Sequence, residues 1–120
     1  MDQYPQDSFH ERLSRLIDEF VHAIYDMTDM LPREELFGVK SQLRRAALSI
    51  ALNYTEGYAR FSKKELGRFL KISYGSLKEV LYLVRFSQRR TWINLSLCEQ
   101  LESQGSDLGG MLWSTFSRLD

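Results

Sequence analysis

The sequence predicts an all-α protein, an up-and-down antiparallel four-helix bundle. Four long segments carry apolar residues three and four positions apart, the spacing that places them on one face of a helix. Only two prolines and seven glycines occur among the 120 residues, which leaves few turns for an all-β fold. Four helices joined by short connections pack as neighbours that alternate in direction. We therefore expect a single domain over residues 1–120.

The first two helices follow from their apolar stripes. The first stripe covers residues 9–31, and Asp7 or Ser8 can cap the start of its helix. The second stripe covers residues 36–54. Gly57 is the expected C-terminal stop of the second helix, because glycine accepts the left-handed backbone conformation that ends many helices.

The third helix has the clearest start. Ser62 and Glu65 form a capping-box pattern, in which each side chain satisfies a free amide of the other residue. Phe61 and Leu66 stand where a hydrophobic staple would close against the first turn. The buried stripe of this helix is then expected over residues 66–84.

Small residues mark where helices three and four can approach their neighbours. Ser73, Gly75 and Ser76 would allow close contact at the middle of the third helix. The fourth apolar segment, residues 97–119, keeps helical spacing. Three glycines weaken it, since each costs about 1 kcal/mol relative to alanine inside a helix; they are Gly105, Gly109 and Gly110.

Charge is unevenly distributed along a chain whose formal net charge is zero. Residues 40–90 contain twelve Lys and Arg against three acids, whereas residues 1–39 contain three bases and nine acids. The last thirty residues are also acidic. Such a chain can fold with a basic face and an acidic face. The basic face can attract a polyanion, or the two faces can bind one another between copies of the chain.

No arrangement of residues predicts catalysis, and we expect neither a cofactor nor a metal. Asp18, His22 and Asp26 share one helix face, but three ligands in a row along one helix make a poor metal shell, and charges at this spacing are typical of a solvated surface. Cys98 is the single cysteine, which excludes an internal disulfide. It has no nearby basic neighbour in sequence to activate it. Phosphate-binding loops and nucleophile elbows are absent from the sequence.

The basic middle of the chain is the stronger functional candidate. Basic residues on the second and third helices and the turn between them could form one surface that contacts phosphate. Aromatic residues lie among them and could stack on bases: Tyr58, Phe61, Tyr74 and Tyr82. The same cations could instead only solubilise a helix face or pair with the acidic first helix. The predicted nucleic-acid-binding residues are Lys40, Arg44, Arg60, Lys63, Lys64, Arg68 and Lys71, and Lys78 continues the row.

A second, polar row follows the second helix beside its apolar stripe. Short polar side chains suit close helix packing with hydrogen-bonded register, within the bundle or between subunits. Solvent-facing helix positions more often carry long charged residues, which favours an interface. The predicted oligomer-interface residues are Gln42, Arg45, Ser49, Asn53 and Glu56.

Residues 35–50, ELFGVKSQLRRAALSI, resemble the signature of small four-helix-bundle proteins encoded in intervening sequences of bacterial 23S ribosomal RNA genes. The resemblance covers nearly the whole chain. It continues through Asn53, Glu56-Gly57, Arg60, residues 62–65, residues 68–70, residues 75–77 and Glu79.

The resemblance implies more than the residues alone do. The same superfamily includes accessory proteins of diversity-generating retroelements, which partner with a reverse transcriptase and its template RNA. Members form homopentameric barrels, so the resemblance implies a homopentamer. The chain departs from the family pattern at Ala51, where a proline is usual, and at Tyr54-Thr55, where isoleucine-alanine is usual. Without the proline the second helix should be less kinked.

Together these observations predict a cytoplasmic, non-enzymatic, homo-oligomeric accessory protein with no membrane segment. Its expected partners are structured RNA, either template or ribosomal, or a ribonucleoprotein partner such as a retroelement reverse transcriptase. The alternative is a protein–protein scaffold that uses the same basic face for an acidic protein and binds no nucleic acid.

Overall fold

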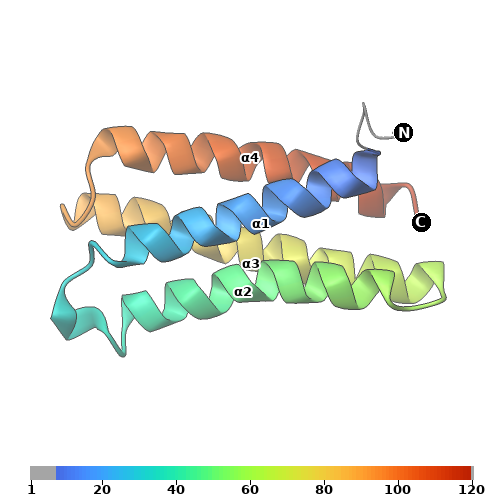
Figure 1. Ribbon diagram of the computed structural model, residues 1–120, viewed down its shortest axis with the longest axis horizontal. Helices are drawn as coiled ribbons and strands as arrows, with labels where there is room; N and C mark the ends of the chain where they lie inside the picture. The colour runs from blue at the N-terminus through green and yellow to red at the C-terminus, as the bar shows by residue number, and fades with distance from the viewer. Residues whose placement is uncertain (1–7, 120) are drawn as a thin grey trace, which may run out of the picture.

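The computed structural model describes residues 8–119, and within that range it contains helices and no strand. The four long helices are α1 (Phe9–Thr28), α2 (Val39–Tyr58), α3 (Lys63–Arg89) and α4 (Leu95–Ser117). A short 3-10 helix, η1 (Arg33–Glu35), lies between α1 and α2. Consecutive helices alternate in direction (Figure 1), so the prediction of an all-α four-helix bundle is confirmed.

The bundle has two ends with different connections. The start of α1, the turn between α2 and α3, and the end of α4 lie at one end, which we call the α2–α3 end (Figure 1). The connection containing η1 and the turn between α3 and α4 lie at the other, which we call the η1 end. No helix of residues 8–119 has both the length and the apolar character needed to cross a lipid bilayer.

Side-chain caps begin three of the helices. Ser8 and Glu11 form a complete capping box at α1, while Asp7 lies outside the described residues. At α3 the Ser62 hydroxyl accepts from the Glu65 amide at 3.0 Å, and the Glu65 carboxylate pairs with Arg68 at 3.3 Å. Asn94 caps α4 by accepting from Leu97 N at 2.8 Å.

The predicted hydrophobic staple at the start of α3 is wrong. Phe61 is fully exposed, at 107% of its reference area, so its ring points into solvent rather than onto Leu66. The residue nevertheless directly precedes the capping Ser62, and the sequence pattern alone does not reveal which way its side chain turns.

The predicted stop at Gly57 is also wrong, because α2 continues through it to Tyr58. Gly57 is buried, and a Cβ atom there would lie 3.0 Å from Phe69 Cβ and 3.2 Å from Leu66 Cδ1. The glycine therefore permits the close approach of α2 and α3 beside their connecting turn. α2 also runs unbroken through Ala51, the position of the family's usual proline.

Two seams flank α3, and they are built differently. Towards α2, the buried Ser73 hydroxyl donates to the Ile50 carbonyl at 2.8 Å, and the Ser49 and Ser76 hydroxyls are hydrogen-bonded at 2.7 Å. Gly75 faces away from this seam and is exposed, so its predicted part in close packing is wrong.

The seam between α3 and α4 uses glycine instead. α4 runs without a break through its three glycines. At Gly105 a Cβ atom would fall 2.6 Å from Leu81 Cδ2, so the glycine admits the Leu81 side chain. The core between the four helices is apolar, and its largest fully buried side chains include Phe20, Leu43, Ile50, Leu77 and Leu112.

Candidate nucleic-acid surface

The predicted basic residues separate into two groups at opposite ends of α2. Lys40 and Arg44 lie near the η1 end and face α1. Arg44 Nη2 lies 3.1 Å from the Asp29 carboxylate, and its Nε donates to the Thr28 hydroxyl at 2.8 Å. Its guanidinium also lies 4.8 Å from the centre of the Tyr25 ring. Lys40 Nζ approaches the same carboxylate at 4.0 Å.

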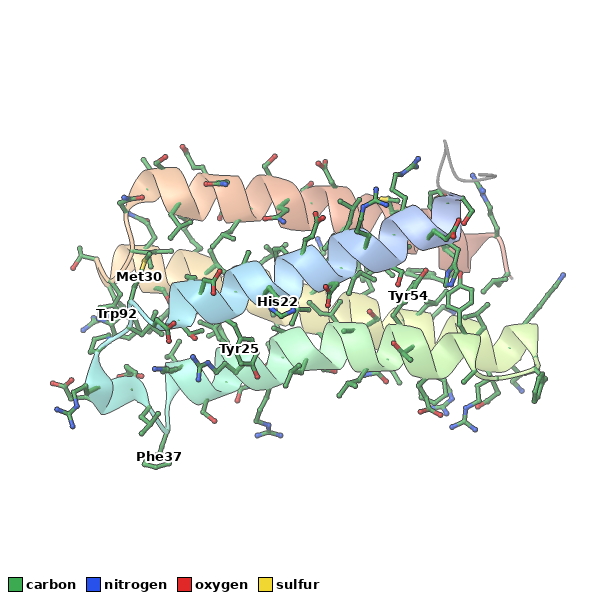
Figure 2. The ribbon with its side chains drawn as sticks, viewed as in Figure 1. His22, Tyr25, Met30, Phe37, Tyr54 and Trp92 are labelled. Carbon is green, nitrogen blue, oxygen red and sulfur yellow. The ribbon has the colours of Figure 1, made fainter. Side chains whose placement is uncertain are left out.

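Arg44 of this first group lines a groove between α1 and α2. The groove has a volume of about 430 Å³, and its lining includes His22, Tyr25 and Arg44. Figure 2 shows His22 and Tyr25 on the part of α1 that lies against α2. Lys40 and Arg44 are thus paired with the acidic residue at the end of α1. Such pairing was the alternative to a single phosphate-binding surface. These two cations lie apart from the other five.

The second group surrounds the turn at the α2–α3 end. Arg60 pairs with Glu56 at 2.7 Å, and Arg68 pairs with Glu65 at 3.3 Å. The Arg60 and Arg68 guanidinium carbons also lie 5.0 Å and 4.4 Å from the centre of the Phe69 ring. Two arginines are therefore held beside the turn by one nearly buried ring.

Three further residues complete this group. Phe61, Lys63 and Lys64 are all exposed, and the two lysines pair with no carboxylate of residues 8–119. We call the whole group the turn cluster: Arg60, Phe61, Lys63, Lys64 and Arg68. It places four cations around one fully exposed aromatic ring, two of them paired with carboxylates of the same chain and two, Lys63 and Lys64, paired with none in residues 8–119.

A basic row continues from the turn cluster along α3. Lys64, Lys71, Lys78 and Arg85 stand seven residues apart, two helical turns, so they share one side of α3. This row, the α3 ridge, is about 32 Å long at 1.5 Å per residue. Lys71 lies 5.9 Å from the ring centre of Phe116 and Lys78 lies 5.3 Å from that of Tyr74, so aromatic rings support the stems of the ridge.

The four aromatic candidates for base stacking differ in availability. Tyr58 packs on His10 with ring centres 4.1 Å apart, and Tyr74 contacts both Trp113 and Phe116. Phe61 and Tyr82, by contrast, are 107% and 70% exposed. Only these last two of the four present most of a ring to solvent.

The predicted interface row on α2 also divides. Gln42 donates to the Glu79 carboxylate of α3, and Asn53 donates to the Ser49 carbonyl at 2.9 Å. With the Ser49–Ser76 contact, these residues serve the α2–α3 seam within one bundle.

The other two interface residues, Arg45 and Glu56, are exposed. They share the outer side of α2 with Leu48 and Leu52, which are 41% and 64% exposed. These leucines lie outside the apolar stripe predicted for the second helix. Two leucines four residues apart and outside the core stripe share an exposed side of a helix. That pattern could have indicated an interface from the sequence.

The possible metal ligands of α1, Asp18, His22 and Asp26, line the groove between α1 and α2. His22 lies 3.6 Å from Asp18, and both side chains are largely exposed. Within the described residues no three His, Cys, Asp or Glu side chains lie close enough together to hold a metal ion. Cys98 is buried, and burial raises the pKa of its thiol although Arg85 acts in the opposite direction. A raised pKa keeps the thiol protonated and unreactive.

The geometry defines a class of protein: a small helical bundle with a cationic, aromatic-bearing surface along α3 and at its first turn. The chain belongs to the family of 23S rRNA-intervening sequence proteins, whose family model matches residues 13–114. This finding agrees with the resemblance found in the sequence.

Among solved structures, the following protein is similar over nearly the whole chain. It is a protein of unknown function from the S23 ribosomal protein family of Bacteroides thetaiotaomicron. The two share 20% sequence identity with a TM-score of 0.84, and the match covers 92% of this chain and 99% of the other. At that identity the likeness shows the fold alone. No curated protein matches the chain.

Proposed function

We propose that this protein is a non-enzymatic accessory protein that binds structured RNA through the turn cluster and the α3 ridge. The observation that carries the proposal is the turn cluster itself. A fully exposed Phe61 stands among four cations, of which Lys63 and Lys64 pair with no carboxylate of the described residues. Unpaired lysines contact phosphates, and exposed rings stack on bases.

The fixed arginines support the same function. Stacking on Phe69 holds Arg60 and Arg68 in place before any ligand arrives, so less side-chain entropy is lost on binding. The lysines of the ridge then extend the positive surface along α3 by about 21 Å, from Lys64 to Lys78, and RNA duplexes present phosphates over such a length. The name of the family refers to 23S rRNA, which agrees with an RNA-containing environment.

We also propose that the protein is a homo-oligomer that uses the outer side of α2. Leu48 and Leu52 are exposed apolar side chains flanked by charges of opposite sign, Arg45 and Glu56. A second copy would cover the leucines and could bring an acid to Arg45, while Glu56 is already paired with Arg60 of the same chain. The pentameric number and a reverse transcriptase partner follow only from the sequence resemblance, and they remain predictions.

The test is RNA binding by purified, nuclease-treated protein, measured by fluorescence anisotropy across a salt series. We expect binding to a labelled RNA hairpin that weakens steeply as salt rises. Lys63→Glu combined with Lys64→Glu should weaken binding at least 10-fold, the loss of about two phosphate contacts at low salt. The matched control is Arg12→Glu with Arg33→Glu, which changes the charge equally on exposed residues of α1 and η1.

Light scattering in the same buffer reports the mass of the particle. Unchanged affinity in the Lys63/Lys64 variant, or an equal loss in the control, would show that the turn cluster is not the site. A folded protein that binds no RNA at low salt would instead favour the scaffold function, in which the basic surface binds an acidic protein.

A further inference from the structure

A pocket on the last two turns of α3 lies beyond the residues predicted to bind RNA. Its volume is about 380 Å³, and its lining contains two aromatic and three arginine side chains and no acidic one: Tyr82, Arg85, Phe86, Arg89 and Arg90. This volume is within the range of small-ligand pockets. The α3 ridge ends here, since Arg85 is both its last member and part of the pocket.

Arg85 is fixed by partners outside the pocket. Its Nε and Nη2 donate to the two carboxylate oxygens of Glu102 on α4, at 2.9 Å and 2.5 Å, and its Nη1 donates to Gln88 at 3.4 Å. Three of the five N–H donors of the guanidinium are thus engaged, and the ion pair is bidentate. The bonds fix the plane of the group, and its flat face, which stacks on nucleobases, stays available to a ligand together with two N–H donors.

The aromatic residues of the pocket differ in exposure. Tyr82 is 70% exposed, whereas Phe86 is half-buried, and their ring centres are 6.5 Å apart with the planes inclined by 32°. Trp92 supports Phe86 from behind, edge to face at 6.0 Å. Figure 2 shows Trp92 at the η1 end. A supported Phe86 makes a firm floor beside a freely accessible Tyr82 ring.

The turn that follows the pocket is held in a costly conformation. Trp92 N donates to the Ser87 carbonyl at 2.9 Å and Thr91 N to the Gln88 carbonyl at 2.8 Å, the Schellman pattern of a helix end. Glycine usually occupies the left-handed position, but here Thr91 does, with φ of 66°. A β-branched residue is strained in that region. The turn places Trp92 behind Phe86 and leaves Arg89 and Arg90 exposed.

Arg89 and Arg90 are the free charges of the pocket. Both are exposed, and neither pairs with an acid among residues 8–119. The ion pair to Glu102 neutralises Arg85 but leaves these two positive charges at the rim. The pocket therefore combines flat stacking surfaces inside with anion-binding groups outside.

We propose that this pocket binds an unpaired nucleotide of an RNA strand. The base stacks on Tyr82 and on the face of Arg85, and Arg89 and Arg90 contact the adjoining phosphates. The proposal rests on the proposed function and deepens it: duplex RNA lies along the turn cluster and ridge, and a single-stranded extension reaches the pocket. Base pairs within a duplex cannot enter, because their faces are covered by stacking.

The experiment compares two labelled hairpins that have the same stem, one blunt and one with a single-stranded extension of several nucleotides. We expect the wild-type protein to bind the extended hairpin more tightly. Tyr82→Ala should weaken binding of the extended hairpin by about 5-fold or more, the smaller end of one base–aromatic stack, and leave the blunt hairpin unchanged. Tyr82→Phe keeps the ring and should restore the wild-type preference.

A charge variant and a spectroscopic signal complete the design. Arg89→Ala should lower affinity for the extended hairpin, whereas Arg33→Ala, the same change on η1, should not. In a Trp113→Phe background Trp92 is the single tryptophan, and its fluorescence should change with the extended hairpin but not with the blunt one.

The outcomes separate the pocket from the proposed function. If the wild-type protein binds both hairpins equally and Tyr82→Ala has no effect, the pocket assignment is wrong while RNA binding stands. If it binds neither hairpin at low salt, both are wrong. The protein could also bind no RNA and instead bind an acidic protein in a way that depends on Tyr82. That result would likewise show that the pocket does not bind a nucleotide.

Discussion

Arg44 and Lys64 carry the same charge, yet Arg44 is partly buried against three side chains at the end of α1 whereas Lys64 extends into solvent. Arg44 contacts Asp29, Thr28 and Tyr25, so its charge contributes to holding two helices together. Lys64 belongs to the turn cluster and contacts no acid of the described residues. The difference teaches that local neighbours, rather than the density of basic residues along the chain, decide which cations can bind a polyanion.

The largest difference between the two groups of cations is expected in how RNA binding and protein stability respond to salt. If four cations of the turn cluster contact phosphate, raising salt from about 50 to about 200 mM should weaken RNA binding by about 50-fold at the slope of a single strand and about 150-fold at that of a duplex. The free energy of unfolding should change by less than about 0.5 kcal/mol, because short ion pairs on the protein are screened far less than extended arrays of phosphate contacts. Anisotropy titrations and urea denaturation at both salt concentrations measure the two quantities. RNA binding that ignores salt would contradict the assignment of the turn cluster.

Arg44→Ala should act on stability instead of binding. It removes a charged hydrogen bond, an ion pair and a ring contact, and we expect a loss of about 2 kcal/mol in the free energy of unfolding. RNA affinity should stay within 2-fold at temperatures where the variant is folded. Lys64→Ala is the matched control, and its stability should stay within about 0.5 kcal/mol of the wild type. Equal stability of the two variants would remove the distinction between the groups.

The fold could be predicted from the sequence because its signals are local. Helical spacing of apolar residues and the capping residues Ser8 and Ser62 depend on neighbours within four positions. Gly57 and Phe61 were misjudged for the opposite reason. Gly57 is set by a contact with Phe69 on the next helix, and the direction of Phe61 depends on the path of the turn. Neither can be inferred from residues close in sequence.

The candidate site was predictable in part for a related reason. Sequence spacing correctly places Lys64 and Lys71 on one side of α3, because both lie on the same helix. It cannot show that Arg44 meets Asp29, since that contact joins two helices across a connection. The arginines at the end of α3 were missed as a site, although Arg85 continues the seven-residue spacing of the ridge and could have indicated them. Their significance depends on Tyr82 and on the Schellman turn.

Phe61→Ala tests the aromatic part of the turn cluster without changing its charge. Loss of one stacking ring should weaken binding of an RNA hairpin with an unpaired loop by about 5-fold. Stability should change by less than about 0.5 kcal/mol, because the ring is fully exposed. Phe37→Ala is a well-matched control: Phe37 is 92% exposed on the connection at the η1 end, where Figure 2 shows its ring pointing away from the helices. If both variants lost affinity equally, general hydrophobic contact rather than a defined stack would explain the loss.

Asp29→Asn is the smallest expected change and the sharpest test of the comparison, because it removes the acid shared by Lys40 and Arg44. Asp29 is 71% exposed, so the loss of stability should be under about 1 kcal/mol. Arg44 keeps its contacts with Thr28 and Tyr25 and therefore stays against α1, and we expect RNA affinity to rise by less than 2-fold. Asp26→Asn, one turn earlier on α1, is the control for the change in net charge. A rise of 10-fold in Asp29→Asn alone would mean that pairing, not position, had kept these two cations from RNA, and the phosphate-binding surface would then extend along α2 as well as α3.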